Sequence, residues 1–277
     1  MEIIDSFLSY GGQQKVIRHK SSALSCDMTF ALYEPEPIKD KTYPVLWYLS
    51  GLTCTHTNVL EKGEYRRTAS ELGVIIVCPD TSPRGKEIPD EPDNWQFGTG
   101  AGFYLDATNS PYDKNYKMYS YITEELPLLL KQKCFITSNS HGIFGHSMGG
   151  HGAITIALKN PNTYKSCSAL APITQPSTAS WSRSAFEKYL GGNQESWRKY
   201  DATQLIEDGY TFPEILVDQG LNDPFLEEGL RPELLKAACE KKGINLDLRM
   251  RKGYDHSYYF ISTFIESHIR WHHERLT

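Results

Sequence analysis

The amino-acid sequence predicts an α/β protein built on a mostly parallel β-sheet with helices on both faces. Segments of strand character alternate along the chain with segments of helical periodicity, which is typical of parallel strands joined by helical crossovers. Most strand segments are near-continuous apolar runs, as strands covered on both faces require. The 277 residues are enough for one large domain, and neither an internal repeat nor a linker divides them. We therefore expect a single domain over residues 1–277.

The individual elements follow from local patterns. Before residue 35, two segments that alternate apolar and polar residues, including DMTFALYEP, predict antiparallel strands at an edge of the sheet. Further strands are expected at 43–50, 73–79, 142–147, 167–173, 214–220 and 245–253. Helices are expected between them at 59–72, 117–133, 148–160, 232–242 and 257–275.

Residues 81–116 form a long segment of weak periodicity that is rich in Gly, Pro and Asp. Loops of this length are usually either functional or disordered. Aromatic side chains occur along the segment and favour an ordered excursion over the edge of the sheet. They include Trp95, Phe97, Phe103, Tyr104 and Tyr116.

Composition and charge argue against several classes of function. The formal net charge is -5, with 29 basic and 34 acidic residues, so a nucleic-acid backbone is not an expected partner. Acidic residues stand where a signal peptide needs basic ones, and no apolar run approaches the length of a membrane span. The cysteines include no CxxC pair, which predicts reduced thiols in a cytoplasmic protein. They are Cys26, Cys54, Cys78, Cys134, Cys167 and Cys239.

The stretch GHSMG, from Gly145 to Gly149, matches the pattern G-x-S-x-G. The pattern indicates a nucleophilic serine only where a strand enters it and a helix leaves it, and both conditions hold here. The sharp turn strains the serine backbone, and side chains two positions before and after it would collide with neighbouring chain. Gly150 and Gly152 would further allow the helix to lie close to the sheet. The sequence therefore predicts Ser147 as a nucleophile in an α/β-hydrolase fold.

A serine hydroxyl needs a base to accept its proton, and in this fold an acid and then a histidine follow the serine along the chain. His256 lies between the last expected strand and the last expected helix, where a catalytic histidine is expected. Four of the nine histidines precede Ser147 and do not fit this order. They are His19, His56, His141 and His146.

The remaining histidines have simpler interpretations. His151 lies on the helix after the serine, where it is packed or exposed. His268, His272 and His273 lie on the final helix. His268 and His272 are spaced for metal binding, but no carboxylate or cysteine cluster supports a metal, and a solvated helix face is the favoured interpretation. We expect neither a metal nor an organic cofactor.

Asp223 is the predicted acid. It follows the expected strand 214–220 and is free to turn towards His256. Asp218 lies inside that strand, and Asp255 is adjacent to His256, where two side chains usually point apart. Asp218 and Asp255 remain as alternatives.

Two backbone N–H groups are expected to bind the oxyanion of an acyl-transfer reaction. One belongs to Met148, the residue after the nucleophile. The other belongs to Leu52, which follows Gly51 in the loop after the strand 43–50.

Six motifs also occur in the order known from one enzyme family: SGLTC, PDTSPRG, GTGAGFY, GHSMGGHGA, DQGLNDPFL and GYDHSYYF. With them the chain closely resembles the S-formylglutathione hydrolase (esterase D) family, from about residue 2 to the C-terminus. The resemblance implies a cytoplasmic serine thioesterase, often dimeric, that cleaves S-formylglutathione to formate and glutathione in formaldehyde detoxification. Cleavage of short-chain carboxylic esters is expected as well. By position, the family's nucleophile, acid, base and oxyanion donors fall on Ser147, Asp223, His256, Leu52 and Met148.

The resemblance adds two residues near the site. Cys54 matches a cysteine that is linked to sensitivity to thiol reagents, and a buried apolar cysteine is the alternative interpretation. Trp181 resembles a tryptophan that lines the acyl pocket, although Ser180 and Ser182 replace the usual Pro and Gly and so affect the expected pocket width. Candidates to meet the carboxylates of glutathione are Lys62, Arg84 and Lys86, each of which is otherwise an ordinary solvated charge.

Two other functions stay open. A carboxylesterase or acyltransferase with another substrate would use the same fold and residues. A catalytically silent binding protein would usually lack one of the three catalytic residues, whereas all three candidates are present here.

Overall fold

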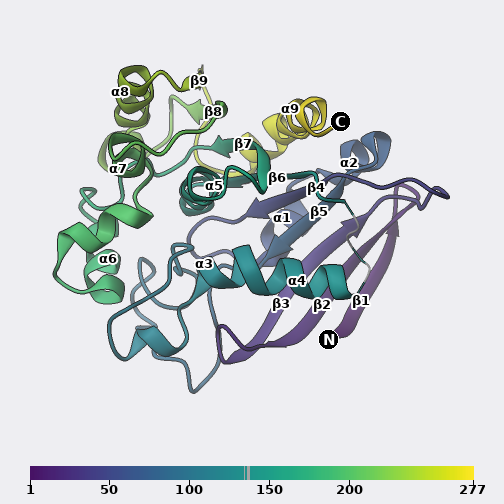
Figure 1. Cartoon of the computed structure of the whole chain (residues 1–277), viewed down its shortest axis with the longest axis horizontal. Helices are drawn as coiled ribbons and strands as arrows, with labels where there is room; N and C mark the ends of the chain where they lie inside the picture. The colour runs from purple at the N-terminus through teal and green to yellow at the C-terminus, as the bar shows by residue number, and fades with distance from the viewer. Residues whose placement is uncertain (134, 136–137) are drawn as a thin grey trace.

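The protein is organised around one β-sheet. The computed structural model describes residues 1–133, 135 and 138–277. Across these residues, nine strands form one sheet in the order β1-β2-β3-β5-β4-β6-β7-β8-β9 (Figure 1). The strands are β1 (Glu2–Ser9), β2 (Gly12–Ser21), β3 (Cys26–Glu34), β4 (Val45–Leu49), β5 (Ile75–Pro79), β6 (His141–His146), β7 (Tyr164–Leu170), β8 (Glu214–Gly220) and β9 (Asn245–Arg251).

The sheet has an antiparallel part and a parallel part. β1, β2 and β3 pair antiparallel in sequence, and β3 pairs antiparallel with β5. From β5 through β4, β6, β7 and β8 to β9, every pairing is parallel. The prediction of a mostly parallel sheet with antiparallel N-terminal strands is therefore confirmed.

The N-terminal region contains three strands, and the prediction of two was wrong. β1 and β2 form a hairpin through Tyr10 and Gly11, which both have positive φ, at 49° and 78°. β1 lies at the edge of the sheet, and most of its side chains are exposed on both faces. Because neither face is buried, β1 lacks the alternation by which a half-buried strand is detected in a sequence.

The helices connect and cover the strands. They are α1 (His56–Lys62), α2 (Arg66–Leu72), α3 (Met118–Ser120), α4 (Leu126–Gln132), α5 (Met148–Lys159), α6 (Ser182–Leu190), α7 (Ala202–Glu207), α8 (Pro232–Lys242) and α9 (Tyr258–Leu276). Short 3₁₀ helices occur at 112–114 and 194–200, and π-helical turns occur at 121–125 and 226–230.

Several helices differ from the expected ones. The segment 59–72 holds two helices, because α1 ends at Lys62 and is capped by Gly63, and α2 begins only at Arg66. The segment 117–133 combines α3, a π-helical turn and α4. α6 and α7 were not predicted, whereas α8 has the predicted bounds.

Successive side chains of β7 show that α5 and α9 cover opposite faces of the sheet. Side chains along a strand point alternately to its two faces. A Cβ at Gly150 of α5 would lie 3.2 Å from the Cβ of Ala169. Ser168, the preceding residue of β7, instead hydrogen-bonds His268 and His272 of α9. The sheet is therefore covered on both faces where these helices pack, as its apolar strands predict.

The interpretation of His268 and His272 as a solvated helix face was wrong. Both side chains are fully buried. The Ser168 hydroxyl lies 2.7 Å from Nδ1 of His268 and 2.8 Å from Nε2 of His272. The other nitrogens lie 2.9 Å from Asp218 Oδ2 and 2.6 Å from Ser166 Oγ. Polar groups of the sheet thus provide the partners that buried imidazoles require.

The excursion 81–116 is ordered against the rest of the fold. Of its six aromatic side chains four are buried, Tyr112 is partly buried and Trp95 is exposed. Tyr189 of α6 packs against two of them, with ring centroids 4.5 Å from Phe97 and 4.9 Å from Tyr116. The Tyr189 hydroxyl also donates a hydrogen bond of 3.0 Å to the carbonyl of Ala101. The segment therefore forms a fixed wall beside the carboxyl end of the sheet.

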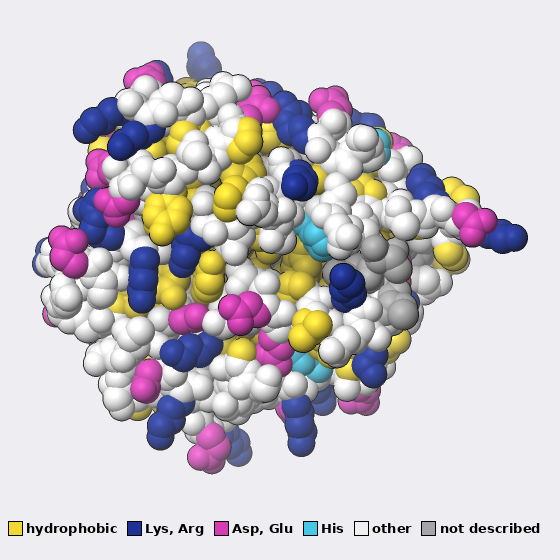
Figure 2. Space-filling model, in the orientation of Figure 1, with side chains coloured by type: hydrophobic (Ala, Val, Ile, Leu, Met, Phe, Trp, Pro, Cys, Tyr) yellow, Lys and Arg dark blue, Asp and Glu magenta, His cyan; other side chains and the backbone are white. Residues whose placement is uncertain are grey.

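The charged side chains on the surface and the state of the cysteines are as the composition leads us to expect. Positive and negative side chains are interspersed on the face shown in Figure 2. Among the described helices, none is both long and apolar enough to cross a membrane. Five cysteines are present as free thiols, and Cys134 lies outside the described residues. The five are Cys26, Cys54, Cys78, Cys167 and Cys239.

Candidate active site

Ser147 stands at the sharp turn between β6 and α5. Its backbone has φ 56° and ψ -119°, a conformation that a residue with a side chain rarely adopts. The Ser147 N–H donates a hydrogen bond of 2.9 Å to the carbonyl of Leu170, which fixes the turn to the end of β7. A strained backbone held in place by its surroundings is common at functional positions.

The glycines around Ser147 are required by close backbone approach. A Cβ at Gly145 would lie 2.4 Å from the carbonyl oxygen of Gly149, and a Cβ at Gly149 would lie 2.0 Å from that of Leu49. Gly150 faces Pro172 and the sheet, as expected, since its Cβ would lie 3.0 Å from the Cβ of Pro172. Gly152 differs from the expectation, because it faces the ring of Tyr104 in the excursion rather than the sheet.

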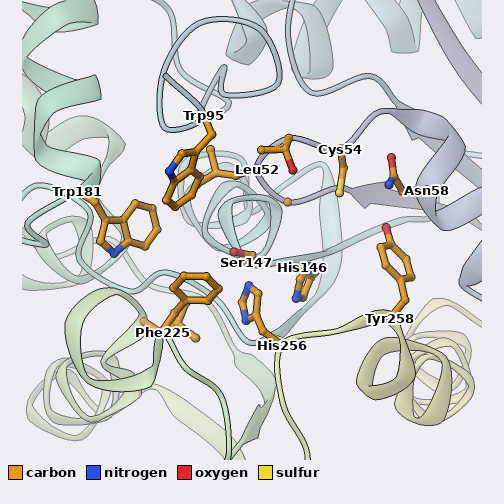
Figure 3. A pocket seen from close by; sticks show the side chains of 13 residues that line it. Leu52, Cys54, Asn58, Trp95, His146, Ser147, Trp181, Phe225, His256 and Tyr258 are labelled. Atoms are coloured by element: carbon orange, nitrogen blue, oxygen red, sulfur yellow. The ribbon is translucent and has the colours of Figure 1, made fainter. Parts of the chain in front are cut away.

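His256 and Asp223 lie together at the carboxyl end of the sheet. Nδ1 of His256 is 2.6 Å from Oδ2 of Asp223. The Asp223 carboxylate also accepts hydrogen bonds from the N–H of Phe225 at 2.9 Å and from the amide of Gln219 at 3.2 Å. These contacts fix the orientation of the imidazole. Its ring lies beside Ser147 in the same cavity (Figure 3).

The two alternative acids have other partners. Asp218 is fully buried and hydrogen-bonds His268 at 2.9 Å, and it forms an ion pair with Arg251. Asp255 accepts hydrogen bonds at the start of α9 from the N–H of Ser257, at 2.9 Å, and from its hydroxyl, at 2.7 Å. Of the three aspartates, Asp223 is the one that hydrogen-bonds His256.

The two expected oxyanion donors have N–H groups without local partners. Met148 is the first residue of α5, so its N–H has no carbonyl one turn earlier in the helix. In the loop after β4, the N–H groups of Thr53 and Cys54 bond to Gly100 and Gly51, whereas the N–H of Leu52 bonds to no described residue. Both groups are thus available to an oxyanion.

A cavity of about 420 Å³ surrounds Ser147 and His256. Trp95, Trp181 and Phe225 line one end of it, which we call the aromatic end, and Cys54, Asn58 and Tyr258 line the other, the polar end (Figure 3). Ser147 lies between the two ends. The remaining lining residues are Gly51, Leu52, Thr53, His146 and Leu230.

The aromatic end is formed by three rings from separate segments. Trp95 of the excursion lies 5.9 Å from Trp181 and 6.5 Å from Phe225, measured between ring centroids. Trp181 packs directly on Gly229, where a Cβ would lie 2.4 Å from the indole ring. The hydroxyl of Ser182 donates to the carbonyl of Pro176 at 2.7 Å. This hydroxyl is bonded in the protein interior and does not line the cavity. The width of the pocket at this end is therefore set by Trp181 rather than by Ser182.

The polar end holds neutral groups. Burial raises the pKa of the Cys54 thiol, and burial likewise raises the pKa of Tyr258. Cys54 is therefore a thiol rather than a thiolate near pH 7. Arg84 supports the loop from outside, since its guanidinium binds Asp80 and donates to the carbonyl of Cys54 at 3.2 Å.

His146 is a site residue that the chain-order argument set aside. Its ring centroid is 4.4 Å from that of His256, and it is 6 % exposed. Burial holds the pKa of His146 well below its usual value, so the ring is neutral beside His256. The sequence feature that could have identified His146 as a site residue is its position directly before Ser147. Trp95, Asn58, Phe225 and Tyr258 were also missed as lining residues, because they come from four separate segments.

Comparison with known proteins identifies the family. Residues 21–271 match the model of the esterase family described as putative esterase. A mouse (Mus musculus) protein named S-formylglutathione hydrolase is 50 % identical over 97 % of this chain and 96 % of its own length. The chain belongs to the S-formylglutathione hydrolase family of esterases.

Solved structures of relatives agree with this assignment. A structure of an S-formylglutathione hydrolase from Agrobacterium tumefaciens has a TM-score of 0.98 and 60 % identity, and the match covers 100 % of both chains. A fluorophosphonate-binding serine hydrolase from Staphylococcus aureus has a TM-score of 0.73 with 19 % identity, covering 95 % of this chain and 98 % of its own, and shares the fold alone. The family members confirm the α/β-hydrolase fold.

Proposed function

We propose that the protein hydrolyses S-formylglutathione to formate and glutathione by acyl transfer through Ser147. The observation that carries the proposal is the Asp223–His256 hydrogen bond of 2.6 Å beside Ser147 in one cavity. The named relatives support the choice of substrate, since the mouse and Agrobacterium proteins are S-formylglutathione hydrolases.

In the first half of the reaction, Ser147 attacks the formyl carbon. Nε2 of His256 accepts the hydroxyl proton as the Oγ–carbon bond forms, and the N–H groups of Leu52 and Met148 bind the oxyanion. Collapse of the tetrahedral intermediate breaks the carbon–sulfur bond, and His256 returns the proton to the leaving sulfur. Asp223 fixes the imidazole tautomer and stabilises its charged form.

In the second half, water replaces the thiol. His256 accepts a proton from water as the water oxygen attacks the formyl-serine ester, and the same proton passes to Ser147 Oγ as formic acid leaves and ionises to formate in solvent. Every step uses side chains and backbone groups of the chain itself. Short-chain carboxylic esters present the same carbonyl chemistry and are expected substrates.

Replacement of Ser147 by Ala tests this mechanism. Removing the nucleophile of a serine protease lowers kcat by about 10⁶-fold, and we expect a comparable loss with S-formylglutathione. The thermal unfolding midpoint and labelling of the wild type by a fluorophosphonate serve as controls. Substantial hydrolysis by a folded Ser147→Ala variant would contradict the mechanism.

A second candidate is a carboxylesterase or acyltransferase with another physiological substrate. The aromatic end favours it, because three aromatic rings line the end of the cavity assigned to the acyl group, and a formyl group carries only a hydrogen atom to bury against them. A panel of S-formylglutathione, aryl esters of increasing acyl length and alcohol acceptors separates the two. Higher kcat/KM for a bulkier acyl ester than for S-formylglutathione would favour the second candidate.

The setting of the enzyme is part of the same proposal. We infer action in formaldehyde detoxification in the cytoplasm, as a homodimer, from the family resemblance. Light scattering of the purified protein measures the oligomeric state directly.

Cys54 lies in the cavity wall, so a thiol reagent attached there would add bulk at the polar end and lower activity. A Cys54→Ser variant that kept the full sensitivity would exclude this route.

A further inference from the structure

We propose that Asn58 and Lys62, on one face of α1, bind the glutathione portion of the substrate. The proposal rests on the proposed function, because it concerns the leaving group of that reaction. Glutathione is a peptide with a carboxylate at each end and a net negative charge, so its binding calls for hydrogen-bond donors and a cation. Of the three basic candidates that the sequence offers, Lys86 is an exposed residue of the excursion, and Arg84 and Lys62 differ in their partners.

Arg84 is already engaged. Its Nε lies 3.0 Å from Asp80 Oδ2 and its Nη2 lies 3.1 Å from Asp80 Oδ1, so both carboxylate oxygens are bound. Nη2 also donates to the carbonyl of Cys54. Arg84 therefore holds the loop of the polar end in place and has its charge offset.

Asn58 presents an oriented donor at the polar end. Its Oδ1 accepts a hydrogen bond of 2.9 Å from the N–H of Thr55, which closes the capping box of α1. This bond fixes the amide plane and leaves Nδ2 without a hydrogen bond to any described residue. Because Asn58 lines the cavity, Nδ2 can donate to a peptide carbonyl or a carboxylate of the leaving group.

Lys62 supplies a cation next to that donor. It follows Asn58 by four residues on α1, so the two side chains share a face of the helix. The charge of Lys62 acts on the polar end, since it lowers the pKa of Cys54 against the larger, opposing effect of burial. Lys62 is exposed and pairs with no acidic side chain of the described residues. The neighbouring Cys54 and Tyr258 are neutral and do not offset its charge.

The reaction geometry places the leaving group at this end. The acyl substituent and the leaving sulfur lie on different sides of the attacked carbon. With the acyl group towards Trp181, as the family resemblance implies, the sulfur and its peptide extend towards Cys54 and Asn58. If the charged peptide lay at the aromatic end instead, it would lose water without gaining polar partners from the apolar rings, which is unfavourable.

The test compares S-formylglutathione with 4-nitrophenyl acetate, which lacks a peptide and a charge. For each variant we take the ratio of the two kcat/KM values. Lys62→Gln should lower this ratio about two- to fivefold, as expected for one exposed ion pair. Asn58→Asp should lower it by about tenfold, because it keeps the Oδ1 acceptor of the helix cap, removes the donor and adds a repelling charge.

The control variant is Lys165→Gln, an exposed lysine at the amino-terminal end of β7, opposite the site. It should leave the ratio unchanged. The effect of Lys62→Gln should shrink as salt is added, because salt screens exposed charges. A ratio equal to wild type in both α1 variants, with unfolding midpoints preserved, would overturn the proposal. A wild-type enzyme that cleaves the aryl ester but not S-formylglutathione would instead overturn the proposed function, on which this proposal depends.

Discussion

Gly149 is the residue where a single methyl group tests the packing of the turn around Ser147. A Cβ at this position would lie 2.0 Å from the carbonyl oxygen of Leu49 and 2.6 Å from that of Ser50. Ordinary contact begins at 3.4 Å, so α5 and the end of β4 would have to separate by about 1.4 Å. Both contacts are with backbone atoms, which cannot rotate away as a side chain can.

The displacement acts on stability and on the oxyanion site together. Overpacking of this kind costs about 1–3 kcal/mol of unfolding free energy. The displaced chain leads directly into Gly51 and Leu52, and the loss of one oxyanion donor lowers kcat by about 10²- to 10³-fold in a serine protease. We expect Gly149→Ala to lower kcat by that factor.

The assay pairs thermal unfolding with kcat on a short aryl ester. Gly192→Ala is the matched control, because a Cβ at Gly192 meets no atom within 4 Å. The control should keep the wild-type kcat and an unfolding midpoint within a few degrees. If Gly149→Ala also kept both, the argument that backbone contact positions Leu52 would be wrong.

Three further predictions concern buried polar groups. Asp223→Asn should lower kcat by about 10⁴-fold, as the same change does in a serine protease, because the amide favours the wrong tautomer of His256. Asp218→Ala should lower the free energy of unfolding by about 1–3 kcal/mol, measured in denaturant, because it leaves the neutral imidazole of His268 buried without its hydrogen-bond acceptor. Burial lowers the pKa of His151 to about 3. As pH falls from 6.5 towards 3, the unfolded chain binds a proton there that the folded chain does not, and stability falls by about 1.4 kcal/mol per pH unit from this residue.

Matched variants make each of these predictions specific. An unfolding midpoint near wild type for Asp223→Asn would show that its loss of activity is chemical. Asp208→Ala breaks an exposed ion pair with Arg198 and should cost under about 1 kcal/mol. His151→Gln can still accept the N–H of Ala202 and should flatten the fall in stability between pH 6 and pH 4. An unchanged pH slope in that variant would rule out His151 as a contributor.

The sequence predicts the helices and strands that are buried on one face or on both faces. β8 has the predicted bounds because its apolar residues form a continuous run, and α8 has them because Pro232 starts it and Gly243 ends it. Two strands rather than three were predicted before residue 35, where β1 has the weakest pattern because its side chains are exposed on both faces. α6 and α7 are short and lie in a region without a long periodic pattern, so tertiary packing rather than local propensity establishes them.

The candidate site likewise contains residues that the sequence predicts and residues that it does not. Ser147, Asp223 and His256 could be selected because their chemistry and chain order follow a known pattern, and the structure brings all three together. Trp95 and Asn58 could not be selected in this way. Their places in the cavity depend on how the excursion folds against α6 and on how α1 is capped, which are tertiary contacts that no local pattern encodes.

The edge position of β1 has a practical use. Five strand spacings separate it from β6, which carries Ser147 at its end, and at about 4.8 Å per spacing this amounts to about 24 Å. A dye, a resin linker or a fused reporter joined to Met1 would therefore sit well away from the chemistry. Immobilising the enzyme through its first residue should leave turnover intact, which makes this residue a suitable attachment point.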